Sequence, residues 1–266
     1  MKIGYISDLH IDYNKQFNIL QALINEIINQ NIEVLLIGGD TSNSTVLTRS
    51  FVSKVIEFTG IQVHYIYGNH DYYTLDQGFH KDRELQNTFN PLIINGVGII
   101  ADTGWYDYRW YTRGCGQFNK LLRGHFGYGN TWPDHRFIKW PEDAGDDKSG
   151  RWFAQFSLEE MKKQNQRLDE LRVTSKIVMT HMVPHEEFLL KQYEYLETNV
   201  FFGGQSLSDF IRGLSPDMVL FGHTHFSFDK EKDGTWYICS PLGYNFEWSM
   251  ADADYEVKRK LVTFEL

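Results

Sequence analysis

The first third of the chain alternates apolar strand-like runs with helical patterns, and this alternation restricts the fold more than any other feature. The strand-like runs are Lys2–Ser7, Val34–Ile37 and Val63–Tyr67. Apolar residues from Phe17 to Ile28 fall on one helical face, and Val46 to Phe58 reads as a second helix. This β-α-β-α-β order predicts a sheet of parallel neighbouring strands covered by helices.

The remainder of the chain predicts further strands and one long helix. Residues Leu158 to Leu171 indicate a charged surface helix. The predicted strands lie near Ile93–Asn95, Gly98–Ala101, Lys176–Thr180 and Met218–Phe221, with closing antiparallel strands at Thr235–Cys239 and Leu261–Glu265. The pattern therefore favours an α/β fold.

Residues from about 102 to 155 differ from the rest, because no period of 2 or 3.6 runs through them. Five of the seven tryptophans lie there, which argues against disorder. We expect an ordered insertion or lid within a single domain spanning residues 1–266. Its aromatic side chains favour a small core of their own over stacking on a base or sugar. The candidates for substrate contact are Arg109, Arg113, His125 and His135, although the arginines can equally pair with aspartates of the same segment.

Composition limits the partners of the chain. The 266 residues carry a formal net charge of −9, which argues against a long nucleic acid as partner but leaves nucleotides open, since cations can supply positive charge locally. No apolar stretch reaches the roughly 20 residues of a membrane span. The two cysteines, Cys115 and Cys239, are typical of reduced thiols in a cytoplasmic protein. The sequence does not determine the oligomeric state.

Polar residues follow five predicted strands at the point where each strand ends. These residues are Asp8 and His10; Gly39 and Asp40; Gly68, Asn69, His70 and Asp71; His181; and Gly222, His223 and His225. Sites in open α/β sheets lie at the carboxyl ends of the strands, so we expect these side chains to meet. Taken singly, the aspartates could be helix caps or turn residues. The oxygen and nitrogen ligands suit Mn, Fe, Zn or Ni better than a soft metal such as Cu(I).

The spacing within these segments has a physical reason. Asp8 and His10 are two residues apart, so an extended backbone directs both to the same side, and His223 and His225 repeat the arrangement. Two cations about 3.5–4 Å apart can clamp a phosphate and activate a water between them. Such a pair needs a bridging carboxylate, for which Asp40 is the best candidate.

Together, the five ordered motifs resemble those of the calcineurin-like metallophosphoesterase superfamily, in its bacterial or phage-type metallophosphatase branch. The resemblance implies a four-layer αββα sandwich of two mixed β-sheets with flanking helices. It implies that Asp8, His10 and His225 hold one cation, that Asn69, His181 and His223 hold the other, and that Asp40 bridges them. His70 would donate a proton to the leaving alkoxide or bind the phosphoryl oxygen, with a role as another metal ligand as the alternative, and Asp71 would orient its ring. Family members often carry an acid three residues after the bridging aspartate, where this chain has Asn43.

The resemblance implies a two-metal hydrolase of phosphomonoesters or phosphodiesters, acting on a small molecule or a nucleotide through a metal-activated hydroxide. Manganese is the favoured cation. Two alternatives are a nuclease of the same superfamily and a scaffold that keeps the fold without catalysis. The acidic composition disfavours the nuclease, and the complete ligand set disfavours the scaffold.

Overall fold

The computed structural model describes residues 1–86, 92–110, 125–126, 130–141, 150–191 and 198–266. Its first third follows the predicted alternation, with two helices between three parallel strands. These elements are β1 (Lys2–Ile6), α1 (Ile19–Gln30), β2 (Val34–Gly38), α2 (Thr45–Thr59) and β3 (Gln62–Ile66). Strand β12 (Val262–Glu265) pairs antiparallel with β1, which gives one sheet the order β12-β1-β2-β3.

A second sheet contains the remaining long strands in the order β10-β11-β9-β8-β5-β4. Its strands are β4 (Leu92–Ile94), β5 (Val97–Asp102), β8 (Lys176–Thr180), β9 (Met218–Phe221), β10 (Phe228–Lys232) and β11 (Thr235–Cys239). The predicted strand at Thr235–Cys239 is confirmed, but its expected orientation is only half right. It runs antiparallel to β10 and parallel to β9, because the chain crosses from β9 through β10 before entering it.

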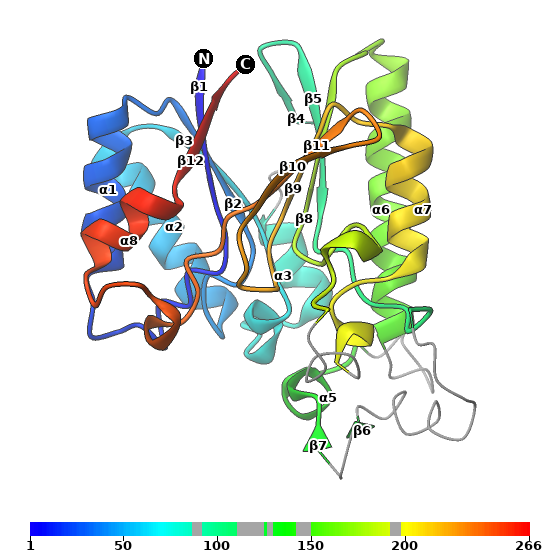
Figure 1. The fold of residues 1–266 in the computed structure, drawn as a ribbon, viewed down its shortest axis with the longest axis horizontal. Helices are drawn as coiled ribbons and strands as arrows, with labels where there is room; N and C mark the ends of the chain where they lie inside the picture. Colours follow the sequence, from blue (N-terminus) through cyan, green and yellow to red (C-terminus); the bar gives the residue numbers. More distant parts are fainter. Residues whose placement is uncertain (87–91, 111–124, 127–129, 142–149, 192–197) are drawn as a thin grey trace.

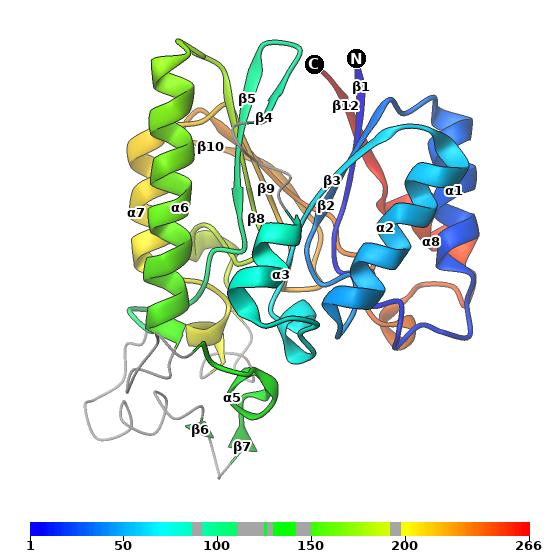
Figure 2. The ribbon, with the colours of Figure 1, turned by 180° about the vertical axis from the view of Figure 1, so that it is seen from behind.

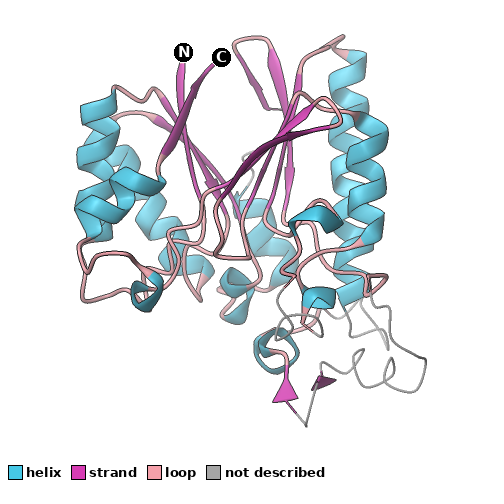
Figure 3. Cartoon of the chain, viewed as in Figure 1, coloured by secondary structure: helices cyan, strands magenta, loops and turns pink. Residues whose placement is uncertain are grey.

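The two sheets lie face to face between two layers of helices, which confirms the four-layer αββα fold (Figures 1 and 3). Helices α1, α2 and α8 (Ala253–Lys260) cover the first sheet. Helices α6 (Gly150–Glu170) and α7 (Gln205–Leu214) cover the second. None of the described helices combines the length and the apolar character of a membrane span.

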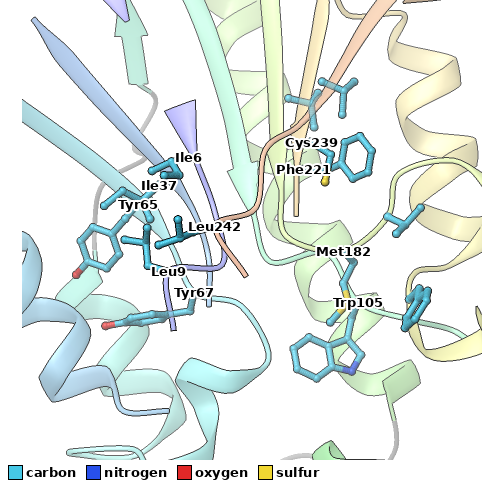
Figure 4. Packing of buried hydrophobic residues seen from close by; sticks show 14 of the residues in the cluster. Ile6, Leu9, Ile37, Tyr65, Tyr67, Trp105, Met182, Phe221, Cys239 and Leu242 are labelled. Carbon is cyan, nitrogen blue, oxygen red and sulfur yellow. The ribbon is translucent and has the colours of Figure 1, made fainter. Parts of the chain in front are cut away.

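Alternating side chains of each strand face different cores. Ile3 and Tyr5 of β1 join the cluster between the sheets, whereas Ile6 joins the cluster beneath the helices. Strands buried on both faces need apolar residues at nearly every position, which explains the unbroken apolar run of β2. Figure 4 shows the larger cluster on both sheets, with Ile6 near the first sheet and Phe221 near the second.

Two details of the helices differ from the sequence prediction. Ile28 is 59% exposed and so does not belong to the buried face of α1, which includes Leu23 and Ile27. Helix α6 begins at Gly150, eight residues before the predicted start at Leu158. Phe153, in the first turns of this helix, is buried in the core. This packing against distant residues stabilises the start of the helix, and the charged pattern of the later turns did not predict it.

Much of the segment from about 102 to 155 lies outside the described residues. Its described elements are β6 (His125–Phe126), β7 (Asn130–Thr131) and α5 (Pro133–Phe137), which lie beyond the lower ends of the strands and of α3 (Phe79–Gln86) in Figure 2. The tryptophans were expected to form a separate small core. Trp105 instead belongs to the main core, and four others pack against it: Trp110, Trp132, Trp140 and Trp152. Short 3₁₀ helices complete the described elements: η1 (His70–Tyr73), η3 (Glu186–Phe188), η5 (Asn199–Phe201) and η6 (Asn245–Glu247).

Candidate metal centre

Five strands end where the two sheets approach each other, at the lower end of the strands in Figure 1. Polar side chains that follow these strand ends come close together there. Three groups have potential ligand atoms within 4.8 Å of one another: Asp8, His10 and His225; His10, Asp40 and His70; and Asp40, His181 and His223. Asp40 belongs to two of these groups and lies between the other ligands. The sequence-predicted residues therefore lie close together in space, and Asp40 shares close ligand atoms with members of both other groups.

The separations between ligand atoms fit bound cations. Metal ligands at about 2.1 Å from a cation lie about 3.0–3.4 Å from each other in octahedral or tetrahedral geometry. Nε2 of His10 lies 3.0 Å from Nε2 of His225, which lies 3.5 Å from Oδ1 of Asp8. On the other side, Nε2 of His181 lies 3.1 Å from Oδ1 of Asn69 and 3.3 Å from Oδ2 of Asp40. Buried oxygen and imidazole donors at these distances match the chemistry of divalent transition metals.

The backbone of the centre adopts unusual conformations. Five of the proposed ligands have positive φ angles, between 42° and 73°: Asp8, His10, Asp40, His223 and His225. Non-glycine residues rarely occupy this left-handed region, and such strain gathers at functional sites where the surrounding structure enforces it. The chain therefore turns sharply after β1, β2 and β9, so that these polar side chains leave the direction of the strand. The extended backbone predicted for the pairs Asp8–His10 and His223–His225 is wrong, because all four residues are left-handed.

Two glycines allow the strand ends to approach the carboxylates. A Cβ atom at Gly68 would overlap the Asp40 carboxylate, and one at Gly222 would overlap that of Asp8. The resulting contacts include hydrogen bonds from the backbone N–H of His70 to Asp40 Oδ1 (2.9 Å) and from that of His223 to Asp8 Oδ1 (3.1 Å). These donors fix both carboxylates before any cation binds.

Hydrogen bonds select which nitrogen of each imidazole faces the centre. His181 donates from Nδ1 to the Gly38 carbonyl (2.9 Å), which leaves Nε2 as the ligand atom. His223 donates from Nε2 to the Phe201 carbonyl (3.2 Å), which leaves Nδ1. His225 donates from Nδ1 to Glu247 Oε2 (2.8 Å), which leaves Nε2.

Burial and mutual charge set the protonation of the cluster. Burial raises the pKa of Asp8, but hydrogen bonding to His225 and the charges of His181 and His225 outweigh it and lower this pKa to about 2. Burial lowers the pKa of His181, but the Asp40 charge and hydrogen bond raise it to about 9. Burial and the His181 charge lower the pKa of His223 to about 3. The carboxylate of Asp8 thus remains ionised and attracts positive charge to the centre.

Asp134, a residue that the sequence analysis did not select, holds the ligand Asn69. Its buried carboxylate accepts hydrogen bonds from Asn69 Nδ2 (2.8 Å) and from the hydroxyls of Tyr73 (2.7 Å) and Tyr106 (3.0 Å). A further bond comes from Trp132 Nε1 (2.9 Å). Because Asp134 binds the amide nitrogen, Oδ1 of Asn69 is directed toward His181. The position of Asp134 after Pro133 resembles a helix start, so no local pattern indicated this role.

His70 is oriented by a different residue from the one predicted. Its Nδ1 donates to Asn43 Oδ1 (2.7 Å), which directs Nε2 toward Asp40, at 4.0 Å from Oδ2. Asp71 instead accepts from the backbone of Gly68 (2.8 Å) and from Thr48 Oγ1 (2.5 Å). The prediction that Asp71 orients His70 is therefore wrong: its carboxylate closes the turn that carries His70. A signal was present in the family resemblance, which leads one to expect an acid where this chain has Asn43.

The four candidates for substrate contact are less well placed or lie outside the described part of the chain. Arg109 is largely exposed and contacts Ser206 Oγ (3.2 Å) and Asp209 (3.9 Å) at the start of α7. The ring of His135 contacts the Tyr108 hydroxyl (3.1 Å). Arg113 lies outside the described residues, and only the backbone of His125 is described, in β6.

Solved structures with the same fold support the architecture. Phosphopantetheinyl hydrolase from Mycobacterium tuberculosis is 16% identical over 97% of this chain and 92% of its own, with a TM-score of 0.67. A dimetal phosphatase from Danio rerio is 11% identical over 90% of this chain and 86% of its own, with a TM-score of 0.53. The protein TT1561 of Thermus thermophilus is 14% identical over 99% of this chain and 97% of its own, with a TM-score of 0.52. At these identities the likeness establishes the fold.

Comparison of sequences gives the family. No curated protein sequence matches the chain significantly. The sequence profile named calcineurin-like phosphoesterase matches residues 1–227, which include every motif of the centre described above. The chain therefore belongs to the calcineurin-like phosphoesterase family and is a phosphoester hydrolase of that family.

Proposed function

We propose that the chain hydrolyses phosphomonoesters or phosphodiesters at a pair of divalent cations. Asp8, His10 and His225 would hold one cation, and Asn69, His181 and His223 the other. The single observation that supports this pairing is the position of Asp40, whose carboxylate lies close to His10 of the first group and to His181 and His223 of the second. When bound, the cations would neutralise the phosphate and lower the pKa of a water between them.

The protein side chains would position the reaction and move one proton. His70 would donate a proton from Nε2 to the departing alkoxide, because the Asn43 carboxamide accepts at Nδ1 and so fixes the ring with Nε2 toward the centre. The backbone N–H groups of His70 and His223 would hold the carboxylates in place while the charge of the phosphate changes.

Asp40→Asn tests the bridging role. The substitution removes the negative charge shared by both ligand groups, so we expect loss of at least one cation and a fall in aryl phosphate hydrolysis of more than about 100-fold. Elemental analysis and rate measurement check both expectations. Asp229→Asn, on the exposed strand β10, is the control and should keep both properties. Two bound cations and a full rate in Asp40→Asn would exclude the bridge.

Three further features remain proposals. We propose manganese as the cation, which metal analysis of the purified protein and reconstitution with Mn, Fe, Zn or Ni would test. We propose a single domain, with residues 102–155 as an insertion beside the centre; the contact from Asp134 to Asn69 supports this relation. A cytoplasmic location remains a prediction from the cysteine content.

A further inference from the structure

Three aromatic side chains form a continuous surface beside the proposed metal centre. We define this aromatic shelf as Tyr13, Tyr244 and Phe246. Tyr244 stacks on the ring of His10, with centroids 4.4 Å apart and an interplanar angle of 29°. Phe246 stacks on Tyr244 at 5.3 Å and 20°, and Tyr13 meets Tyr244 edge-on at 5.1 Å. The shelf therefore extends outward directly from an imidazole of the centre.

The outer rings of the shelf are open to solvent. Phe246 is 78% exposed and Tyr13 is 48% exposed. Single exposed aromatic residues are common and need no explanation. Here, however, both exposed rings contact Tyr244, which stacks on His10. Tyr13 also approaches the ring of His70, at 6.2 Å between centroids. An apolar surface in this position would meet whatever group the phosphate carries.

The segment that carries Phe246 is held in place by polar contacts. Asn14, which is buried, accepts from the backbone N–H of Asn245 (2.8 Å) and donates to the Gly243 carbonyl (2.9 Å). Glu247 Oε2 accepts from the backbone N–H of Tyr244 (2.7 Å) and from His225 Nδ1. The exposed ring is therefore preorganised by the same residue that orients a proposed ligand, and preorganisation reduces the entropy lost on binding.

The charge of this region limits what it can bind. Glu247 is the one ionisable acid or base within η6, and its carboxylate accepts hydrogen bonds from His225 and from the backbone of Tyr244. The residues of η6 therefore offer no cationic side chain to a second phosphate, whereas a neutral planar ring can stack on an exposed aromatic face. Phe246 is separated from His10 by the ring of Tyr244, so the planar group must be joined to the phosphate by a spacer.

The geometry points to a substrate whose phosphorylated alcohol carries a neutral heteroaromatic ring one sugar-sized spacer from the phosphate, as in a nucleotide, with the ring stacked on Phe246. This inference rests on the proposed function for the position of the phosphate, and it adds the class of alcohol that is released. Stacking on the shelf binds the alcohol portion and contributes specificity, while the centre acts on the phosphate.

The test compares adenosine 5′-monophosphate with ribose 5-phosphate in the Mn-loaded protein. Both substrates release the same kind of primary alkoxide, so leaving-group chemistry is matched and the base is the difference. We expect kcat/KM to favour the nucleotide in the wild type. In Phe246→Ala this preference should fall by about tenfold. Phe58→Ala, which removes a ring of similar exposure (62%) from α2, should leave it unchanged.

Equilibrium binding of adenosine, measured by calorimetry, gives a second readout that requires no hydrolysis. We expect adenosine to bind the wild type and Phe58→Ala equally, and Phe246→Ala about tenfold more weakly. Equal kcat/KM for the two substrates, or adenosine affinity unchanged in Phe246→Ala, would refute the proposal that the substrate stacks on the aromatic shelf. Shelf-dependent adenosine binding would support the shelf. If the same Mn-loaded protein hydrolysed neither of these monoesters nor a bis-aryl phosphodiester, the proposed function would be refuted.

Discussion

Replacing Asp134 with asparagine tests how the insertion supports the proposed metal centre. The substitution keeps the shape of the side chain but converts one carboxylate oxygen into an amide nitrogen. Two of the four partners can only donate: Asn69 Nδ2, which binds Oδ1, and Trp132 Nε1, which binds Oδ2. Whichever way the new amide points, its nitrogen therefore faces a group that cannot accept a hydrogen bond.

The magnitude follows from these contacts. A buried donor without a partner costs about 1–3 kcal/mol, and the remaining hydrogen bonds lose the strengthening that a charged acceptor gives, about 1 kcal/mol each. With two or three such bonds remaining, we expect Asp134→Asn to lower the free energy of unfolding by about 3–6 kcal/mol. If the amide of Asn69 turns, Oδ1 leaves the position facing His181. Loss of such support beside a metal ligand typically weakens metal affinity about 10–100-fold.

Calorimetric titration of the metal-free protein with Mn²⁺ measures this effect, and urea unfolding measures stability. We expect one of two binding events to weaken, namely the one at Asn69, His181 and His223. Asp107→Asn is the matched control, because Asp107 also accepts four hydrogen bonds, from the backbone of Arg109, Gln205 and Ser206 and from the Ser206 hydroxyl.

The control variant should lose stability but bind both cations as the wild type does. If Asp134→Asn and Asp107→Asn bound both cations with affinities within about twofold of each other, Asp134 would have only a structural role, and the reasoning from its contact with Asn69 would be refuted.

Two further substitutions give separate tests. Glu247→Gln weakens the acceptor that fixes the His225 ring. We therefore expect about tenfold lower affinity for the cation proposed at Asp8, His10 and His225, measured in the same Mn²⁺ titration. An unchanged affinity would contradict the role of Glu247 in orienting His225. Burial raises the pKa of Glu256, but hydrogen bonds with Ser249 and Arg259 outweigh burial and hold this pKa below its usual value. Such a carboxyl stabilises the fold above its unfolded-state pKa of about 4.3, and the contribution is lost as the pH falls through the folded-state pKa. The free energy of unfolding of the wild type should therefore fall more steeply than that of Glu256→Gln between about pH 6 and about pH 3. Parallel curves from urea unfolding would contradict this assignment.

The local pattern was sufficient to predict most of the elements of the first sheet. Helix α2 was predicted at Val46 to Phe58 and extends from Thr45 to Thr59. The prediction succeeded because the apolar spacing of the helix and the Gly60 that ends it are both visible in the local sequence. The start of α6 was missed because its first turns are stabilised by aromatic packing against the core, which spacing along the chain does not reveal. The direction of β11 also depended on a partner strand distant in sequence.

The same distinction applies to the proposed centre. Asp8, Asp40, His181 and His223 could be selected from the sequence because each directly follows or lies near the end of an apolar strand, and parallel strands bring their carboxyl ends to one edge. The chain itself therefore determined which strand ends carry the potential ligands. It also determined their chemistry, through oxygen and imidazole donors without a thiolate.

Only the tertiary structure decided how these side chains are held. Asp134 reaches Asn69 across 65 residues of sequence, and Glu247 reaches His225 from a different loop. Asn43, not Asp71, contacts His70, because the orientation of a ring depends on which side chain lies beside it in space. Strand-end ligands follow from local order along the chain, whereas their supporting hydrogen bonds and the aromatic shelf arise from contacts between segments that only folding brings together.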